Sequence, residues 1–270
     1  MVQTFEEALK LSKKSEPRFE GAFDSTWYQG RAGFGGIVGA AMLGAIEEVL
    51  GDESLLLRAV QVTFCAPVLA ESFFIDVEVV RRGSSVVNMM ARLHQGDVVK
   101  SLLVANYGRR RETGVEFSTT KAPEVPAPEL VPTVPFSPIF PNFAQHFEMK
   151  FCVGEIPYSR AERSYLGGWC RIHEDQHRLD FKRGLALLDI WPPAIYSTLG
   201  GPRPSATVSW QVVFTADLPL VESSPEDFYL VTVESTEASS GFAAERGYLY
   251  DQSGRSLAHA LQSVAIFGGS

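Results

Sequence analysis

The feature that most constrains the fold is one order of patterns that occurs twice along the chain. In each copy a strongly apolar helix candidate precedes four strand candidates, which short turn-like separators join into an antiparallel meander. The first copy has its helix at 33–51 and its strands at 58–64, 72–82, 84–95 and 98–107. The second copy has its helix candidate at 179–195, which Pro192 and Pro193 stop, and its strands at 205–214, 227–236, 241–250 and 255–267. The repeat predicts an α+β chain of two similar units, each a buried helix wrapped by a curved sheet.

Prolines gather between the two copies. Of the 16 prolines, 7 lie between Pro123 and Pro141. Proline has no amide donor and a fixed φ, so this segment forms neither a helix nor a central strand. We therefore expect an N-terminal unit over 1–115, a stiff, extended linker over 116–145 and a C-terminal unit over 146–270.

The composition is that of a folded globular protein, with 45% hydrophobic and 21% charged residues. A net charge of −8 argues against binding to nucleic acid or to an anionic membrane, since both require a positive surface. The run Arg109–Arg111 is the local exception, and it is either a solvated edge or a contact for a ligand phosphate. No apolar run approaches the ~18 residues of a membrane span, and the N-terminus lacks the apolar core of a signal peptide. Cys65, Cys152 and Cys170 are too scattered for a disulfide framework, so we expect free, buried thiols and a reducing cytoplasm.

Asp189 is an acid within a helix candidate that is otherwise expected to be buried. A carboxylate in such surroundings loses hydration, which costs several kcal/mol unless it gains partners. Its pKa is often raised, and a raised pKa suits a general base. Two other interpretations remain: Asp189 caps the turn before Pro192 and Pro193, or it lies on a narrow solvent-facing stripe.

Two further polar residues occur in strand candidates. Gln262 shares a register with apolar residues, but the alternate register is also largely apolar, so the inward face is unresolved. An inward glutamine would need hydrogen-bond partners, because an unpaired buried amide costs about 1–3 kcal/mol. Thr207 begins its strand in register with Ser209 and Gln211, on the face opposite Trp210, and by itself it is an ordinary strand threonine.

Six segments together resemble the hotdog superfamily, and within it the double-hotdog acyl-CoA thioesterases of the bacterial thioesterase II (TesB-like) family. They are RAGFGGIVGAAML (31–43), VTFCAPV (62–68), GGWCRI (167–172), DIWPPAI (189–195), SATVSWQVVF (205–214) and AHALQSVAIF (258–267). The resemblance extends from about Phe19 to Phe267, and it rests on the order and spacing of the segments. It implies two tandem hotdog folds in one chain.

The resemblance also implies a site. An aspartate on the second helix, a threonine early in the next strand and a glutamine on the last strand hold the attacking water in this family, and Asp189, Thr207 and Gln262 match them. Backbone N–H groups at a helix start would meet the oxyanion, with Gly35 and Gly36 as candidates; tight helix packing is their other interpretation.

The implied activity is hydrolysis of acyl-CoA to a fatty acid and CoA without a covalent intermediate or a cofactor, in fatty-acid metabolism, by a homodimer. Asp189 lies 18 residues before Thr207, and the same count from around Val60 in the first half ends near Met42, where there is no acid. We therefore expect one site per chain, with the first half as a partner wall.

Other segments of the sequence allow other interpretations. Cys170, His173 and His177 have spacings that could ligate zinc, but no fourth ligand is indicated, so no metal is expected. The segment 254–258 is a near miss to a nucleophile elbow, and it falls in a hairpin. A non-catalytic module that binds acyl-CoA or an acyl carrier, and an accessory protein that assembles through its sheets, remain the alternative functions.

Overall fold

The computed structural model describes residues 2–268. Its helices are α1 (Phe5–Ala8), α2 (Gly35–Leu50) and α3 (Phe181–Leu188), with short 3-10 turns η1 (Ser25–Trp27), η2 (Pro128–Leu130), η3 (Asn142–His146) and η4 (Ala194–Thr198). Strands of the first half are β1 (Ser12–Ser15), β2 (Arg18–Gly21), β3 (Tyr28–Gln29), β4 (Ala32–Gly33), β5 (Leu56–Phe64), β6 (Phe73–Arg82), β7 (Val86–Gln95) and β8 (Val98–Gly108). Strands of the second half are β9 (Phe147–Gly154), β10 (Tyr165–Ile172), β11 (Ser205–Phe214), β12 (Tyr229–Ser239), β13 (Phe242–Tyr250) and β14 (Ser256–Ile266).

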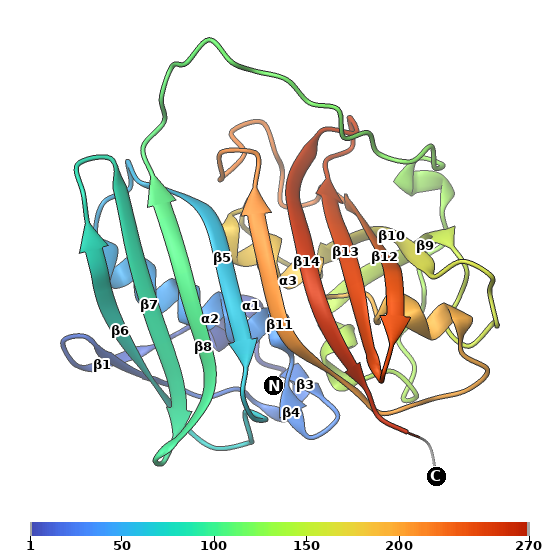
Figure 1. The fold of residues 1–270 in the computed structure, drawn as a ribbon, viewed down its shortest axis with the longest axis horizontal. Coiled ribbons are helices and arrows are strands. Elements are labelled where there is room, and N and C mark those ends of the chain that lie inside the picture. The colour runs from blue at the N-terminus through green and yellow to red at the C-terminus, as the bar shows by residue number, and fades with distance from the viewer. Residues whose placement is uncertain (1, 269–270) are drawn as a thin grey trace.

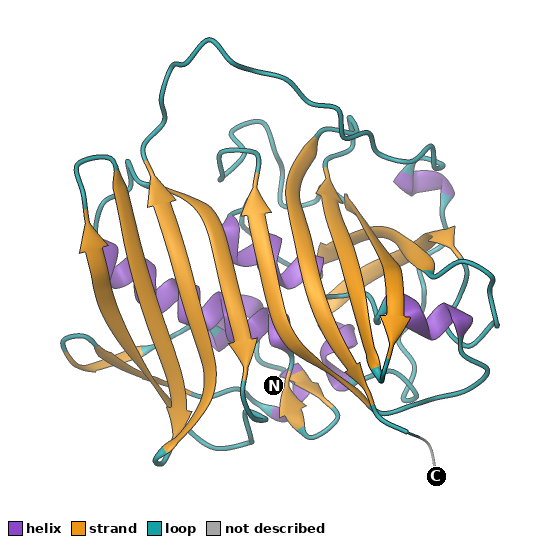
Figure 2. Ribbon diagram, viewed as in Figure 1, coloured by secondary structure: helices purple, strands orange, loops and turns teal. Residues whose placement is uncertain are grey.

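One large antiparallel sheet carries both halves, and helices α2 and α3 lie against its concave face (Figures 1 and 2). The strand order is β1-β2-β6-β7-β8-β5-β11-β14-β13-β12-β10-β9, so the second half repeats the first in reverse. The halves join where β5 pairs with β11, with Gln61 opposite Gln211. This confirms the expected pair of tandem helix-and-sheet units, and all eight predicted strands are present.

The sequence patterns missed the four strands that form the sheet's two outer ends. β1 is an exposed Ser-Lys-Lys-Ser segment, and β2 has only four residues, so neither shows a useful alternation. β9 and β10 were not predicted as strands either, although the segment 167–172 was recognised as a motif. β1 and β2 are too short to show a pattern, whereas β10 is buried along most of its length and so lacks the apolar–polar alternation of a half-buried strand.

Helix α2 is buried on nearly every side, as its apolar sequence predicted. Small residues allow α3 to approach it closely: a Cβ atom added at Gly36 would lie 2.9 Å from the Cα of Ala186. The helix ends at Gly51, whose φ of 58° is the left-handed conformation that glycine adopts most easily.

Helix α3 is shorter than predicted, since it begins at Phe181 and ends at Leu188 rather than covering 179–195. Its start is capped by Asp180, whose side chain accepts a 2.8 Å hydrogen bond from the N–H of Arg183. The chain leaves the helix at Asp189, because Pro192 has no N–H to donate to the carbonyl of Leu188, four residues earlier, and its ring would clash with that carbonyl. The turn η4 follows directly after Pro193.

The proline-rich segment arches from the end of β8 over to the second half (Figure 1). Part of it is anchored there: Val125 and Val131 pack beside Trp169, whose Nε1 donates a 2.9 Å hydrogen bond to the carbonyl of Pro126. Within residues 2–268, no helix has the length and apolarity that crossing a membrane would demand.

The arginine run before this segment forms ion pairs and hydrogen bonds with the protein itself. Arg109 pairs with Asp52 at 2.8 Å, Arg110 pairs with Asp217, and Arg111 donates to the hydroxyl of Ser85 at 2.9 Å. These contacts fit the solvated-edge interpretation.

The cysteines are all free, but the expectation that all three are buried was wrong. Cys170 is buried, whereas Cys65 is exposed and Cys152 is half-buried. Cys65 directly follows the end of β5, where the chain leaves the sheet.

Candidate active site

Asp189 lies at the C-terminal end of α3, against the first turn of α2. The backbone N–H of Gly36 donates a hydrogen bond to its carboxylate. A Cβ atom added at Gly35 would lie 2.7 Å from its Oδ2, so only glycine allows this approach. Burial raises the pKa of Asp189 to about 7, and the Gly36 hydrogen bond offsets the effect only in part. At neutral pH the carboxylate therefore exists in both forms, which is the condition a general base requires.

The position of Asp189 combines two of its predicted interpretations. It does end the helix before the double proline, as the capping interpretation held, and the residue keeps a minor part of its surface exposed although its carboxylate is surrounded by protein. Capping does not use the carboxylate, because the cap contact is made by the backbone N–H, which donates to the carbonyl of Leu187. The side chain is left to face α2.

A β-bulge moves Thr207 to the inner face of the sheet. Strict alternation predicted that Thr207 would lie opposite Trp210, but the pairing of β11 with β14 shifts between Thr207 and Ser209. Thr207 pairs with Val264, and Trp210 pairs with Gln262. Because paired residues share a face, and so do residues two apart on a strand, Thr207 lies on the same side as the fully buried Trp210.

The same pairing resolves the register of β14. Gln262 lies on the face of buried Val264 and Trp210, whereas Leu261 on the other face is 52% exposed. The Nε2 of Gln262 donates a hydrogen bond to the hydroxyl of Thr207. The two candidate residues are thus in contact, 55 positions apart in the chain.

Glu245 is a buried acid beside this pair that the sequence patterns missed. It pairs with Gln262 across β13 and β14, and only 1% of it is exposed. Its Oε1 accepts hydrogen bonds from the N–H of Ile195 at 3.1 Å and from the hydroxyl of Ser235 at 2.6 Å. Within residues 2–268 its Oε2 is buried without a partner, and burial raises the pKa of Glu245. An acid in an otherwise apolar alternation is the signal that would have found it.

Glu245 connects the two parts of the site. The amides that it binds open the turn η4, which follows Asp189 after only four intervening residues. On the other side Glu245 adjoins Gln262, which contacts Thr207. In the part of the chain that the structure describes, no hydrogen bond joins Asp189 directly to Thr207 or Gln262.

The first half has no counterpart of the polar pair. Its β5 carries the same bulge, between Leu57 and Ala59, and Leu57 pairs with Tyr107 as Thr207 pairs with Val264. The position that matches Thr207 is therefore Leu57 and not Val60, because the bulge fixes the match between the halves. The position that matches Gln262 is Ala105.

Cys170 and His177, whose spacing in the sequence could suit zinc, do not come together with His173 as a metal site. Cys170 is buried and its thiol donates to the carbonyl of Tyr229, whereas His177 lies beside Glu6 and Asp175. Among the described residues, Glu6, Asp175 and His177 do bring possible ligand atoms within 4.8 Å of one another. The guanidinium of Arg183 pairs with both acids, so it already supplies the positive charge there.

Solved structures share this architecture over the whole chain. A protein of unknown function with a hot dog fold from Alicyclobacillus acidocaldarius is 26% identical, with a TM-score of 0.89 and 98% of each chain covered. An acyl-CoA thioesterase II from Mycobacterium marinum is 18% identical, with a TM-score of 0.79 and 99% of each chain covered. A tesB protein of Mycobacterium avium subspecies paratuberculosis is 15% identical, with a TM-score of 0.78 and 98% of each chain covered. These likenesses show the hotdog fold.

Family profiles match both halves. The acyl-CoA thioesterase N-terminal domain matches residues 23–108, and the acyl-CoA thioesterase C-terminal domain matches residues 120–266. A comparison with curated proteins finds no match. The two domain matches follow each other in the order that the internal repeat requires, and together they show that this chain belongs to the acyl-CoA thioesterase family.

Proposed function

We propose that this protein hydrolyses acyl-CoA thioesters to a free fatty acid and CoA, through a water held by Asp189, Thr207 and Gln262. The observation that carries the proposal is the carboxylate of Asp189, whose pKa is raised to about 7 at the first turn of a buried helix. A base with a pKa near the working pH is the most effective one for activating water.

The reaction needs no covalent intermediate. Asp189 removes a proton from the water while Thr207 and Gln262 orient its oxygen, which attacks the thioester carbonyl carbon. The tetrahedral intermediate then collapses, the C–S bond breaks, and the CoA thiolate takes the proton back from Asp189. The products are a carboxylic acid and the CoA thiol, so atoms and charge balance.

The first turn of α2 supports the developing oxyanion. Its N-terminal end carries the positive end of the helix dipole, and Phe34 provides no side-chain cap. The N–H of Gly36 already donates to Asp189, whereas Gly35 is the first residue of α2, and no carbonyl of the helix can accept its N–H. Gly35 is therefore the better candidate for the oxyanion, and Gly36 holds the base.

Release of thiol from a series of acyl-CoAs, from acetyl-CoA to stearoyl-CoA, tests the proposal. Steady turnover with at least one chain length is expected. Binding of the same acyl-CoAs without thiol release, measured by calorimetry, would instead support a non-catalytic acyl-CoA or acyl-carrier module on this fold.

We further propose a homodimer that pairs through the outer face of the sheet. Exposed apolar residues lie near the middle of that face: Val104 on β8 is 39% exposed, Val213 on β11 is 42% exposed, and Leu261 on β14 is 52% exposed. Light scattering coupled to gel filtration measures the mass. A monomer at micromolar concentration would contradict this assembly.

A further inference from the structure

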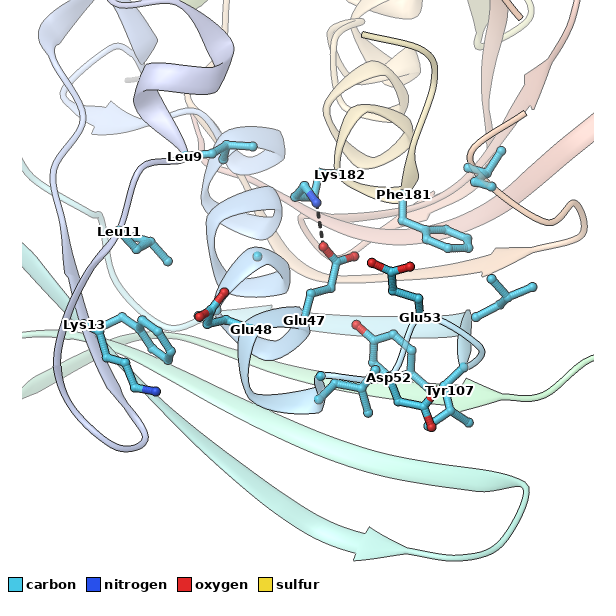
Figure 3. Close-up of a pocket in the computed structure, with 18 of the residues that line it drawn as sticks. Leu9, Leu11, Lys13, Glu47, Glu48, Asp52, Glu53, Tyr107, Phe181 and Lys182 are labelled. Carbon is cyan, nitrogen blue, oxygen red and sulfur yellow. Dashed lines mark hydrogen bonds and ion pairs between the residues drawn. The ribbon is translucent and has the colours of Figure 1, made fainter. Parts of the chain in front are cut away.

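A cavity lies beside the C-terminal end of α2 and the start of α3, at the end of the helix pair away from Asp189; Figure 3 shows side chains that line it. Its volume is about 770 Å³, and it lies between the first half and the start of α3. Its apolar walls come from both halves of the chain: Leu9, Leu11, Phe19, Leu55, Phe181 and Leu218. No step of the proposed hydrolysis uses this cavity.

Glu47 and Lys182 meet in the cavity, where Lys182 Nζ lies 2.5 Å from Glu47 Oε2 (Figure 3). Both side chains are largely buried, at 30% and 24% exposed. Lys182 is shared, because Asp180 Oδ2 lies 3.8 Å from the same Nζ. Burial raises the pKa of Glu47, an effect that the lysine charge offsets only in part. The single charge of Lys182 thus faces two carboxylates, those of Glu47 and Asp180.

A buried hydroxyl beside Glu47 has no partner. Tyr107 lines the cavity and is only 2% exposed, and among residues 2–268 its hydroxyl makes no hydrogen bond. Figure 3 shows this hydroxyl turned toward the cavity, below Glu47. Burial raises the pKa of Tyr107, and the negative charge of Glu47, which lines the same cavity, adds to the effect. An unpaired buried hydroxyl costs about 1–3 kcal/mol, so a ligand that pairs with it gains that contact.

The rim of the cavity is acidic. The lining has five carboxylates, Glu6, Glu47, Glu48, Asp52 and Glu53, against the three amines of Lys10, Lys13 and Lys182. Glu6 and Asp52 are paired with arginines, but in the described chain Glu48 and Glu53 form no ion pair. Lys13 pairs with Glu16, so among the lining groups without an ion pair in the described chain two carboxylates, Glu48 and Glu53, face one amine, that of Lys10. This small surplus of negative charge favours a cation over the phosphates of CoA.

We propose that this cavity binds a cationic amphiphile, an alkylammonium whose head is held by Glu47 and Tyr107 and whose chain lies on the apolar walls. The ammonium donates to the carboxylate of Glu47 and to the oxygen of Tyr107. Lys182 moves its contact to Asp180 when the ligand enters. The site is distinct from the proposed water-activating site and does not rest on hydrolysis.

Isothermal titration with octylammonium chloride tests the proposal, with octanoate and 1-octanol as probes of the same chain length. Saturable binding of one octylammonium per chain is expected, and octanoate should not bind. The Glu47→Gln variant should weaken octylammonium binding by about tenfold or more, since a charged hydrogen bond is lost. Tyr107→Phe should weaken it by about threefold to tenfold.

Lys182→Met gives the opposite prediction, because removal of the competing internal ammonium should tighten octylammonium binding severalfold. Two control variants should bind it as the wild type does: Glu78→Gln, at an exposed acid on β6, and Asp189→Asn, whose unchanged affinity separates this site from catalysis. Equal affinity for octanoate or octanol would overturn the proposal, as would unchanged affinity in both Glu47→Gln and Tyr107→Phe. If Glu47→Gln does not fold, Tyr107→Phe and the comparison of the three probes decide.

Discussion

The two halves of the sheet have the same backbone arrangement. At the matched strand positions of the site, the side chains are polar in the second half and apolar in the first. Thr207 corresponds to Leu57 and Gln262 to Ala105. The match extends to the neighbouring pair of strands, where the bulge after Ser235 corresponds to the bulge after Val79. Ser235 and Val79, like Thr207 and Leu57, are each the last residue of their strand to be paired before the bulge.

In that second pair Glu245 lies opposite Ser235, and Met89 lies opposite Val79. Four polar side chains in the second half thus replace four apolar ones in the first. Because both bulges occur in both halves, they belong to the hotdog backbone and not to the site. The comparison teaches that the chemistry depends on side chains placed on a geometry that the fold supplies twice.

The largest expected effect comes from removing the proposed base. Asp189→Asn keeps the size of the side chain and the contact with Gly36 but cannot accept a proton, so kcat for thiol release should fall by about 10³-fold. Asp97→Asn, at an exposed turn of the first half, is the matched control and should keep full activity. Activity of Asp189→Asn within tenfold of the wild type would remove Asp189 from the mechanism.

The pH dependence tests the same residue without a mutation. The base acts only when deprotonated, and its pKa is about 7, so the rate should rise with pH and level off above about 7. Below the pKa the rate should fall about tenfold for each pH unit, which is about 100-fold at pH 5. Initial rates of thiol release with a pH-independent reporter measure this profile. A flat profile over that range contradicts a base with this pKa.

Glu245→Met replaces Glu245 with methionine, the residue found at the matched position of the first half, Met89. The substitution removes the acceptor for the amides of Ala194 and Ile195, so the segment after Asp189 loses its anchor. We expect kcat to fall by about 10- to 100-fold with little change in KM, because displaced catalytic groups slow the chemical step. Met89→Leu is the control at the matched position. An unchanged kcat for Glu245→Met would restrict Glu245 to a structural role.

The smallest effect on activity is expected from the reverse graft. Leu57→Thr combined with Ala105→Gln builds the polar pair into the first half, where the residue 18 positions before Leu57 is Gly39 and not an acid. Thiol release should stay at the wild-type rate, while the free energy of unfolding in urea should fall by about 2 kcal/mol from the buried polar groups. A doubled rate would show that the first half needs only this pair to become a second site.

Local patterns predicted much of the fold. The apolar run of α2 and the alternation in β5 to β8 and β11 to β14 indicate the right elements, because each signal lies within one segment. The end of α3 was placed too late, since the pattern continues past Leu188 although the prolines end the helix. Asp189 was conspicuous for the same local reason, as an acid among apolar neighbours.

The remainder depends on pairing between distant segments. The bulge that turns Thr207 inward exists only where β11 meets β14, so strict alternation put Thr207 on the wrong face. The match of Thr207 with Leu57 likewise depends on the pairing of β5 with β8. The orphan oxygen of Glu245 and the hydroxyl of Tyr107 become notable only when their surroundings are known.

The pairing of β5 with β11 has a consequence for the integrity of the chain. If the halves were apart, β5 with nine residues and β11 with ten would be the longest strands at a free edge of either sheet. Their pairing removes both edges from solvent. The edges that remain are β1, a short segment with two lysines, and β9. Long unpaired edges recruit strands from other molecules, and charged short ones resist this. A half produced without the other would expose such an edge and aggregate, so each half acts as an intramolecular chaperone for the other.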